Sequence, residues 1–258
     1  MIFETHAHYD DEKFNEDREL LLKEMTDNDV KWIVNVAASM ETARNTIALT
    51  EKYDFIYGAI GVHPNEVEEL NEHHMEWLRE KSALEKIVAI GEIGLDYYYD
   101  EPTKEIQREW FCKQINLARE VKLPMIIHSR DAAQDTLSIM KKEKCGEIGG
   151  VVHCFSYSIE VAKEFLDMGF YIGVGGVVTF PNGKKLKEVV DYLPMDRIVL
   201  ETDSPYLSPA PLRGKRNNSM NIKYIAEEIA GIKNRSVKEV YDTTYQNALK
   251  LYRLNKGV

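Results

Sequence analysis

Six side chains that are able to bind a divalent metal ion stand at or just after the ends of short apolar runs. They are His6, His8, Glu92, His128, His153 and Asp203. Imidazole and carboxylate ligands together suit Zn²⁺, Mn²⁺ and similar ions, whereas Mg²⁺ prefers oxygen ligands. The six residues lie far apart in the sequence, so they form one site only in a fold that brings the ends of these runs together.

The apolar runs have the composition of strands that are covered on both faces. Several are rich in Val and Ile and are apolar at consecutive positions, as in a parallel sheet lying under helices. The eight runs are residues 2–5, 32–37, 56–62, 87–93, 124–127, 150–152, 170–174 and 198–200.

Charge-rich segments whose apolar residues have helical spacing lie between the runs. They are residues 16–29, 41–52, 72–85, 105–121, 132–144, 158–168, 184–192 and 222–229. A last segment, 236–254, opens on Ser236 with Glu239 three residues later, which is a capping-box pattern. Strand and helix alternate eight times, which predicts an α/β fold, the closed (β/α)8 TIM barrel. Because such a barrel takes about 250 residues, we predict one TIM-barrel domain over residues 1–258.

A barrel arranges the C-terminal ends of its strands in one ring, and active sites lie at that end. The first and eighth strands are neighbours across the closure of the barrel. His6 and His8 are two residues apart, so both side chains point to one face of an extended strand. We therefore predict that His6, His8 and Asp203 hold a first divalent ion.

The fifth and sixth strands would supply His128 and His153 to a second ion, and Glu92 on the fourth strand would bridge both ions. A pair of divalent ions, Mg²⁺, Mn²⁺ or Zn²⁺, can activate a water molecule and stabilise the leaving oxygen in hydrolysis. The alternative is a set of unrelated buried polar residues that satisfy each other. The shared position of these residues at the catalytic ends of strands favours the two-ion site.

Two carboxylates are expected to take part in the chemistry. Asp203 would accept the proton of the attacking water while also binding an ion. Glu92, which would bridge the ions, is predicted to be catalytic as well. Glu201 lies two residues before Asp203, on the same strand face. It either accepts a hydrogen bond from a ligating histidine or pairs with an Arg or Lys, and both possibilities stay open.

Four further residues are predicted to bind substrate phosphate. His63 ends the third apolar run, and Arg130 stands at the mouth reached by the fifth run. Arg213 and Lys215 flank a glycine in the irregular stretch 204–219, where the backbone can approach a ligand and the cations match phosphate. The alternatives are a histidine satisfied by a carbonyl group and an ordinary solvated basic surface.

The segment that follows Glu92 carries three consecutive tyrosines, Tyr97, Tyr98 and Tyr99. Tyrosines at the rim of an active site can stack on nucleobases. They can equally cap the barrel, and the sequence does not distinguish these two roles.

The composition restricts the class of protein and the cellular compartment in which it is expected. Lys and Arg number 33 against 43 Asp and Glu, a net charge of −10, so the chain repels nucleic acid at long range. The three cysteines form no CxxC pair, which argues against a disulfide framework or a thiolate zinc site. No apolar stretch approaches the roughly 18 residues of a membrane span. We expect a cytoplasmic protein without a membrane anchor or an obligate protein partner.

The motifs around the candidate residues resemble those of the TatD-related hydrolases, metal-dependent deoxyribonucleases within the amidohydrolase-like barrels. The matching motifs run from end to end of the chain, in a specific order and spacing: Thr5-His6-Ala7-His8, Gly61-Val62-His63-Pro64, Gly91-Glu92-Ile93-Gly94-Leu95-Asp96-Tyr97, His128-Ser129-Arg130, His153-Cys154-Phe155-Ser156, Glu201-Thr202-Asp203-Ser204-Pro205-Tyr206-Leu207 and Arg213-Gly214-Lys215-Arg216-Asn217.

The resemblance implies a (β/α)8 barrel in which the six candidate residues bind divalent metal. It implies hydrolysis of phosphodiester bonds in DNA, often from the 3′ end of single strands, with His63 and Arg130 in contact with phosphate. Asn218-Ser219 stands where many relatives have Glu-Pro, and Leu212 stands where His is common. Both departures lie in the loop after the eighth strand and therefore bear on substrate preference.

Other functions remain possible at the same binuclear site. Some relatives are better described as hydrolases of esters on tRNA, so a D-aminoacyl-tRNA ester is the main alternative substrate. A cyclic amide is another, although related amide hydrolases often bridge their ions with a carboxylated lysine and this chain has Glu92 on the fourth strand. A non-catalytic metal-binding scaffold has little support, since no ligand is missing.

Overall fold

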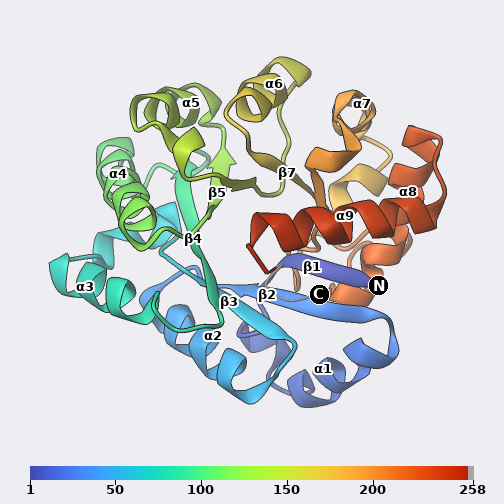
Figure 1. Ribbon diagram of the computed structural model, residues 1–258, viewed down its shortest axis with the longest axis horizontal. Coiled ribbons are helices and arrows are strands. Elements are labelled where there is room, and N and C mark those ends of the chain that lie inside the picture. Colours follow the sequence, from blue (N-terminus) through green and yellow to red (C-terminus); the bar gives the residue numbers. More distant parts are fainter. Residues whose placement is uncertain (255–258) are drawn as a thin grey trace.

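Eight parallel strands form the centre of the molecule (Figure 1). The computed structural model describes residues 1–254, and its strands are β1 Ile2–Ala7, β2 Val30–Val36, β3 Ile56–Ile60, β4 Ile87–Asp96, β5 Met125–Arg130, β6 Gly150–Val152, β7 Tyr171–Val174 and β8 Ile198–Leu200. They are hydrogen-bonded in chain order from β1 to β8. A parallel bridge between Ala7 and Ser204 brings the chain after β8 back to β1. The predicted (β/α)8 barrel is confirmed.

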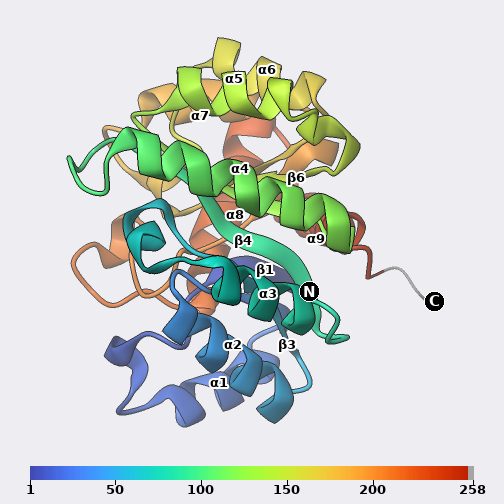
Figure 2. The same cartoon turned by 90° about the vertical axis from the view of Figure 1, so that its left-hand side faces the viewer.

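Helices alternate with the strands and surround them (Figures 1 and 2). They are α1 Arg18–Asp27, α2 Met40–Lys52, α3 Glu72–Lys81, α4 Lys104–Val121, α5 Ala133–Lys142, α6 Ile159–Asp167, α7 Lys184–Tyr192, α8 Ile222–Lys233 and α9 Val237–Leu251. Short 3-10 helices are η1 Glu12–Phe14, η2 Pro64–Glu69, η3 Cys145–Glu147, η4 Gly176–Thr179, η5 Met195–Arg197, η6 Ala210–Leu212 and η7 Ser219–Asn221. The capping box predicted at Ser236 and Glu239 is present at the start of α9.

Several element ends differ from those predicted. Strand β4 continues three residues beyond the predicted end, because it stays paired with β5 as far as Asp96 and Arg130. Helix α8 continues to Lys233, where Asn234 ends it in the left-handed conformation at φ 50°. The prediction of one domain over residues 1–258 includes residues 255–258, which lie outside the described part of the chain.

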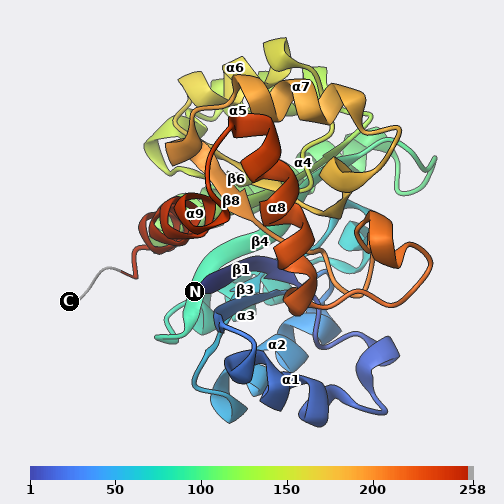
Figure 3. The same ribbon diagram turned by 90° about the vertical axis from the view of Figure 1, so that its right-hand side faces the viewer.

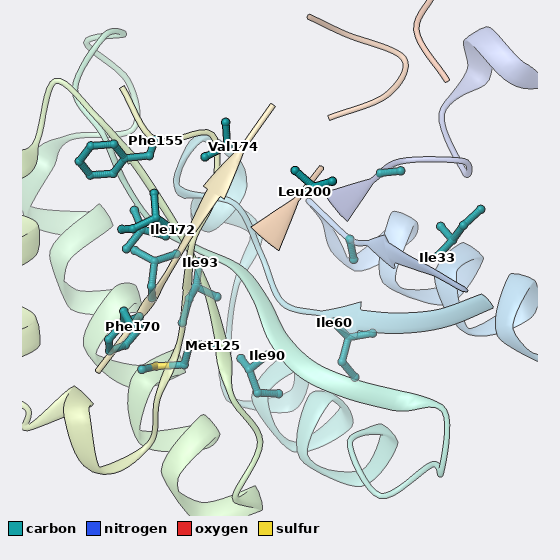
Figure 4. Close-up of a cluster of buried hydrophobic side chains, with 14 of the residues drawn as sticks. Ile33, Ile60, Ile90, Ile93, Met125, Phe155, Phe170, Ile172, Val174 and Leu200 are labelled. Atoms are coloured by element: carbon teal, nitrogen blue, oxygen red, sulfur yellow. The ribbon is translucent and has the colours of Figure 1, made fainter. Parts of the chain in front are cut away.

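The hydrophobic core lies in two layers on the two faces of the barrel wall. Strand residues such as Ile90 and Ile172 belong to a large cluster with helix residues such as Phe165, so this cluster lies between strands and helices (Figure 4). Strand residues on the opposite face of the wall, such as Val151 and Val199, belong to a second cluster. Because side chains alternate along a strand, this second cluster fills the interior of the barrel.

Helix α9 closes one end of the barrel. Its last turn packs Leu251 and the following Tyr252 into the interior cluster, where the Tyr252 ring stacks on Phe3. The Tyr252 hydroxyl donates to the Thr5 carbonyl at 2.8 Å. Figure 3 shows α9 beside the N-terminus, with the loop after β8 at the opposite end. That opposite end is where the strands finish and where a site can open. Within residues 1–254, no helix is both long and apolar enough to cross a bilayer.

Candidate metal centre

The alternation of side chains along three strands points the predicted ligands into the barrel. Ile126 belongs to the interior cluster, and His128 lies two residues later on β5. Val151 of β6 is followed in the same way by His153. Beyond the end of β8, Glu201 lies two residues after Val199. His128, His153 and Glu201 thus continue the inward faces of their strands. Asp203 follows in the left-handed conformation at φ 57°, so a tight turn and not alternation sets its direction.

The first predicted ion group is brought together at the β1–β8 closure. The His6 and His8 Nε2 atoms lie 3.2 Å apart. Asp203 Oδ1 lies 3.3 Å from His8 Nε2 and 3.7 Å from His6 Nε2. These three atoms are close enough to share one ion.

The second predicted group converges on Glu92 Oε1. His128 Nδ1 and His153 Nε2 each lie 2.6 Å from this oxygen and 3.1 Å from each other. The other carboxylate oxygen, Oε2, faces the first group and lies 3.4 Å from His6 Nε2. Glu92 therefore presents one oxygen to each group, as the predicted bridging role requires.

The set of donor atoms fits divalent ions. Four imidazole nitrogens and the carboxylates of Glu92 and Asp203 converge, and no lysine or arginine forms an ion pair with these carboxylates within residues 1–254. In addition, His6 Nδ1 and His153 Nδ1 are buried without a hydrogen-bond partner among the described residues, while the Nε2 atoms of both rings face the Glu92 carboxylate. Mixed nitrogen and oxygen ligation of this kind suits Zn²⁺ or Mn²⁺.

The buried carboxylates and histidines of the centre shift each other's pKa values. Burial would raise the pKa of Glu92 and Asp203, but the surrounding histidines outweigh this effect and hold both pKa values below the usual range. Burial would lower the pKa of His8 and His128, but hydrogen bonds to Asp203, Asp96 and Glu92 raise the pKa values to about 10 and about 9. The same carboxylates that would bind divalent ions therefore favour positive charge on these two imidazoles.

Two of the histidines are held in position by groups outside the predicted site. His128 Nε2 lies 3.1 Å from Asp96 Oδ2, and His8 Nδ1 lies 2.7 Å from the Val36 carbonyl oxygen. Asp96 is 2% exposed, and its other oxygen accepts the backbone N–H of Tyr98 at 2.9 Å. Such partners fix the orientation of a ligating imidazole and the nitrogen that faces the ion.

Glu201 lies behind His153, away from any cation. Its Oε1 is 3.9 Å from His153 Nδ1 and accepts the backbone N–H of Cys154 at 2.5 Å. Its Oε2 has no partner among the described residues, and burial raises the pKa of the carboxyl group to about 8. A Cβ at position 173 would lie 2.2 Å from Oε2, so Gly173 leaves the space that Glu201 occupies. Neither predicted partner is bonded to this carboxyl group: among residues 1–254 no Arg or Lys pairs with it, and 3.9 Å to His153 Nδ1 is too long for a hydrogen bond.

His63 faces the same centre, with its Nε2 3.8 Å from Glu92 Oε1. Distance alone groups it with Glu92 and His128 as a possible ligand. However, its Nδ1 accepts the backbone N–H of Asn65 at 3.2 Å, so the neutral ring carries its proton on Nε2. Burial lowers the pKa of His63 to about 3, which keeps the ring neutral near pH 7. A protonated Nε2 has no lone pair for an ion, so this contact favours the predicted role of His63 as a hydrogen-bond donor toward the cavity.

A cavity of about 520 Å³ opens over these groups at the C-terminal ends of the strands. Besides the histidines, its charged lining residues are Arg130 and five carboxylates, from Asp10, Asp11, Glu92, Asp96 and Asp203. Tyr99 and Tyr206 also line the cavity. A larger groove of about 640 Å³ beside α1 and α2 contains no histidine and none of the predicted ligands. The chemistry therefore belongs to the smaller cavity.

Comparison with known proteins gives the family of this chain. The model of the family described as TatD related DNase matches residues 3–253. The chain belongs to this family.

Relatives cover the whole barrel. The chain is 47% identical over 255 residues to the uncharacterized metal-dependent hydrolase YabD of Bacillus subtilis, covering 99% of this chain and 100% of that protein. It is 38% identical over 258 residues to the uncharacterized metal-dependent hydrolase YcfH of Escherichia coli strain K12, covering 99% and 97%.

Solved structures show the same fold. The structure of YjjV, a TatD homologue from Escherichia coli, superimposes with a TM-score of 0.92 at 31% identity, covering 98% of each chain. A TatD family hydrolase from Entamoeba histolytica gives a TM-score of 0.88 at 26% identity, covering 97% of each chain.

Not all residues of the family motifs meet at the cavity. Arg213 and Lys215 do not line it: the Arg213 guanidinium lies 3.9 Å from the Phe180 ring centroid. Asn217 is buried and donates to the Thr202 and Tyr206 carbonyls, so it anchors the loop after β8. The phosphate-binding roles of Arg213 and Lys215, like the ligand roles of the six residues, stay predictions.

Sequence reasoning missed Asp96 as a partner of His128. One signal was present, since Asp96 follows Glu92 by four residues and an even spacing puts both on one face of a strand. The backbone acceptor at Val36 left no signal, because any residue type supplies a carbonyl group.

Proposed function

We propose that this chain is a metal-dependent hydrolase of the TatD-related family that cleaves phosphodiester bonds of single-stranded DNA, acting from the 3′ end. The observation that carries the proposal is the position of Glu92, whose two oxygens face two separate groups of histidines below a cavity that contains Arg130. The family description and the names of the relatives support a metal-dependent hydrolase, and the family description favours DNA.

The residues around the cavity would have different roles in hydrolysis. His6, His8 and Asp203 would hold one divalent ion, His128 and His153 the other, with Glu92 between them. When bound, the ions would supply an activated water and stabilise the leaving oxygen. The carboxylate of Asp203 would accept the proton of the attacking water.

Two side chains that line the cavity would bind the substrate. His63 would donate its Nε2 proton to a non-bridging oxygen of the phosphate, because its Nδ1 is engaged by the Asn65 N–H. Arg130 would contact the phosphate on its other side with its guanidinium. Since the other charged groups lining the cavity, besides the histidines, are carboxylates, a phosphodiester would be repelled unless divalent cations are present.

We further propose that the full chain, residues 1–258, acts as one hydrolase domain in the cytoplasm, without an obligate protein partner. The expected substrate is a nucleic acid strand that the cavity takes up locally, since the net charge of −10 disfavours attraction over a distance.

The test is cleavage of a single-stranded oligonucleotide by protein stripped of metal, with Mg²⁺, Mn²⁺ or Zn²⁺ restored in turn. A label at the 3′ end should leave first as a mononucleotide, and a label at the 5′ end should remain on a ladder of shortening strands. Cleavage should disappear in the Asp203→Asn variant, because asparagine is a poor proton acceptor and a weaker ligand.

Asp131→Asn is the matched control. Asp203 and Asp131 both adopt the left-handed conformation, at φ 57° and 53°, which asparagine tolerates. Asp131 is exposed and does not line the cavity, so this variant should cleave at the normal rate. A strand that stays intact with every metal would refute the nuclease proposal, and an aminoacylated tRNA would then be the next substrate to test.

A further inference from the structure

Two exposed tyrosines stand at the rim of the cavity, immediately after β4. Tyr98 is 57% exposed and Tyr99 is 52% exposed, which is unusual for large aromatic side chains in this barrel. Their rings meet edge to face, with centroids 4.9 Å apart. Tyr97, the preceding residue, differs: it packs against the core, and its hydroxyl donates to Asp135 at 2.7 Å. Tyr97 is therefore held against α5, whereas the side chains of Tyr98 and Tyr99 make no hydrogen bond with a described residue.

Arg130 connects this pair to the metal centre. Its guanidinium lies 3.7 Å from the centroid of the Tyr98 ring and 5.9 Å from that of Tyr99. The side chain makes no hydrogen bond and no ion pair with a described residue, so its N–H donors are available to a ligand. A guanidinium that lies on an aromatic ring keeps its edge free for bidentate contact with phosphate.

The backbone fixes these side chains relative to the candidate ligands. Asp96 accepts the backbone N–H of Tyr98 with one oxygen, and its other oxygen lies against His128. The backbone N–H of Tyr97 donates to the Arg130 carbonyl at 2.9 Å. The tyrosine pair is therefore tied to the same two strands that carry Glu92 and His128, and Tyr99 lines the cavity with them.

We propose that Tyr98 and Tyr99 form a stacking platform for an unpaired nucleobase of the strand whose phosphate lies at Arg130 and His63. This inference rests on the proposed function, since it assumes that a nucleic acid strand enters the cavity. Aromatic side chains stack on any base and so bind single strands without reading sequence. In a duplex the base faces are covered by neighbouring bases, so the platform would select unpaired ends over double-stranded DNA.

The test is equilibrium binding of two strands of equal length and charge to the Asp203→Asn variant at ion concentrations that saturate its weakened sites, followed by fluorescence anisotropy. One strand is oligo(dT), and the other carries abasic sites in place of its last bases at the 3′ end. The platform predicts about tenfold tighter binding of the strand with bases. Adding Tyr98→Ala and Tyr99→Ala should weaken binding of oligo(dT) to that of the abasic strand and leave binding of the abasic strand unchanged.

Phenylalanine at both positions is the matched control. The Tyr98 and Tyr99 hydroxyls make no hydrogen bond with a described residue, so Tyr98→Phe with Tyr99→Phe should keep the preference for bases. Tyr192→Ala removes a tyrosine that is 46% exposed at the end of α7 and should change nothing. Equal binding of both strands by the protein with its tyrosines, or equal losses for both strands in the alanine variant, would overturn the platform.

The two proposals fail in different ways. Absence of cleavage by the metal-loaded wild-type chain, together with a tyrosine-dependent preference for bases, would refute the nuclease and keep the platform. Cleavage that proceeds equally well in the alanine variant, with no preference for bases in binding, would keep the nuclease and refute the platform.

Discussion

Glu92 is the residue on which the two groups of histidines depend. Its pKa lies well below the usual range in spite of its burial, because five histidines lie within 4 Å of its oxygens, so it stays ionised throughout the neutral range. A buried carboxylate of this kind is costly unless cations compensate its charge. The raised pKa values of His8 and His128 favour their protonated forms beside these carboxylates, and divalent ions would replace those protons.

Asp96 gives the first prediction at this scale. Asp96→Asn should lower the metal affinity by about 10- to 100-fold, because the amide no longer holds His128 as a carboxylate does. Ion binding is measured by calorimetry on metal-stripped protein. Asp100→Asn, in the exposed bend that follows, is the control and should bind ions normally. Unchanged affinity in the Asp96 variant would show that the contact with His128 does not orient the ligand.

His63 gives the second prediction, since its protonated Nε2 makes it a donor and not a ligand. His63→Ala should raise KM for single-stranded DNA by about tenfold, which corresponds to the loss of one hydrogen bond to a charged group. The number of ions bound per chain, counted by elemental analysis, should stay the same. A variant that loses an ion would make His63 a ligand after all.

At the scale of the elements, the strands deliver the site through their alternation. Apolar side chains at positions 126, 151 and 199 point into the barrel, and the polar residues two positions later continue the same face. The six candidate ligands could be named before the fold was known because each stands at or just after the end of an apolar run in the sequence. The position of Asp96 depended on β4 continuing beyond residue 93, and its pairing with β5 is a tertiary effect that local pattern does not report.

Gly173 gives the prediction that belongs to this scale. Gly173→Ala should destabilise the fold by about 1–3 kcal/mol, because the new Cβ would displace the buried Glu201 carboxylate. Thermal unfolding measures this effect. Gly231→Ala in α8, where a Cβ meets nothing within 4 Å, should leave stability unchanged or raise it slightly. In protein that already carries Glu201→Ala, the loss of stability caused by Gly173→Ala should largely vanish. A loss of the same size in both backgrounds would mean that the strain does not come from the Glu201 side chain.

For the molecule as a whole, one end of the barrel is closed by α9 and the other end gathers the chemistry. The strand count and the alternation with helices predicted the barrel with the candidate ligands at one end, and the loop after β8 was expected at that end. Closure of the other end by α9 was not predicted, because it depends on tertiary contacts of Leu251 and Tyr252. The basic run in that loop was harder to interpret: Arg216 pairs with Asp17, and Asn217 anchors the loop. A short run of charges reveals neither which of its members find partners nor how far they lie from the cavity.

The convergence of carboxylates predicts that bound ions stabilise the entire fold. Ligand present at about 100 times its dissociation constant adds about 2.7 kcal/mol to the free energy of unfolding. For a chain of this size, that corresponds to a rise in Tm of roughly 5–10 °C. Calorimetric scans with and without added ions measure the shift, and Asp203→Asn should show a smaller one. Equal Tm values in both conditions would mean that ions do not bind the folded state.

The most direct test of the whole account is the rate of single-strand cleavage as ions are added back to metal-stripped protein in known equivalents. The account predicts no cleavage without ions, a rate that rises until about two equivalents are bound, and no rise in the Asp203→Asn variant. Full cleavage by metal-free protein, or saturation of the ion sites without any cleavage, would contradict it.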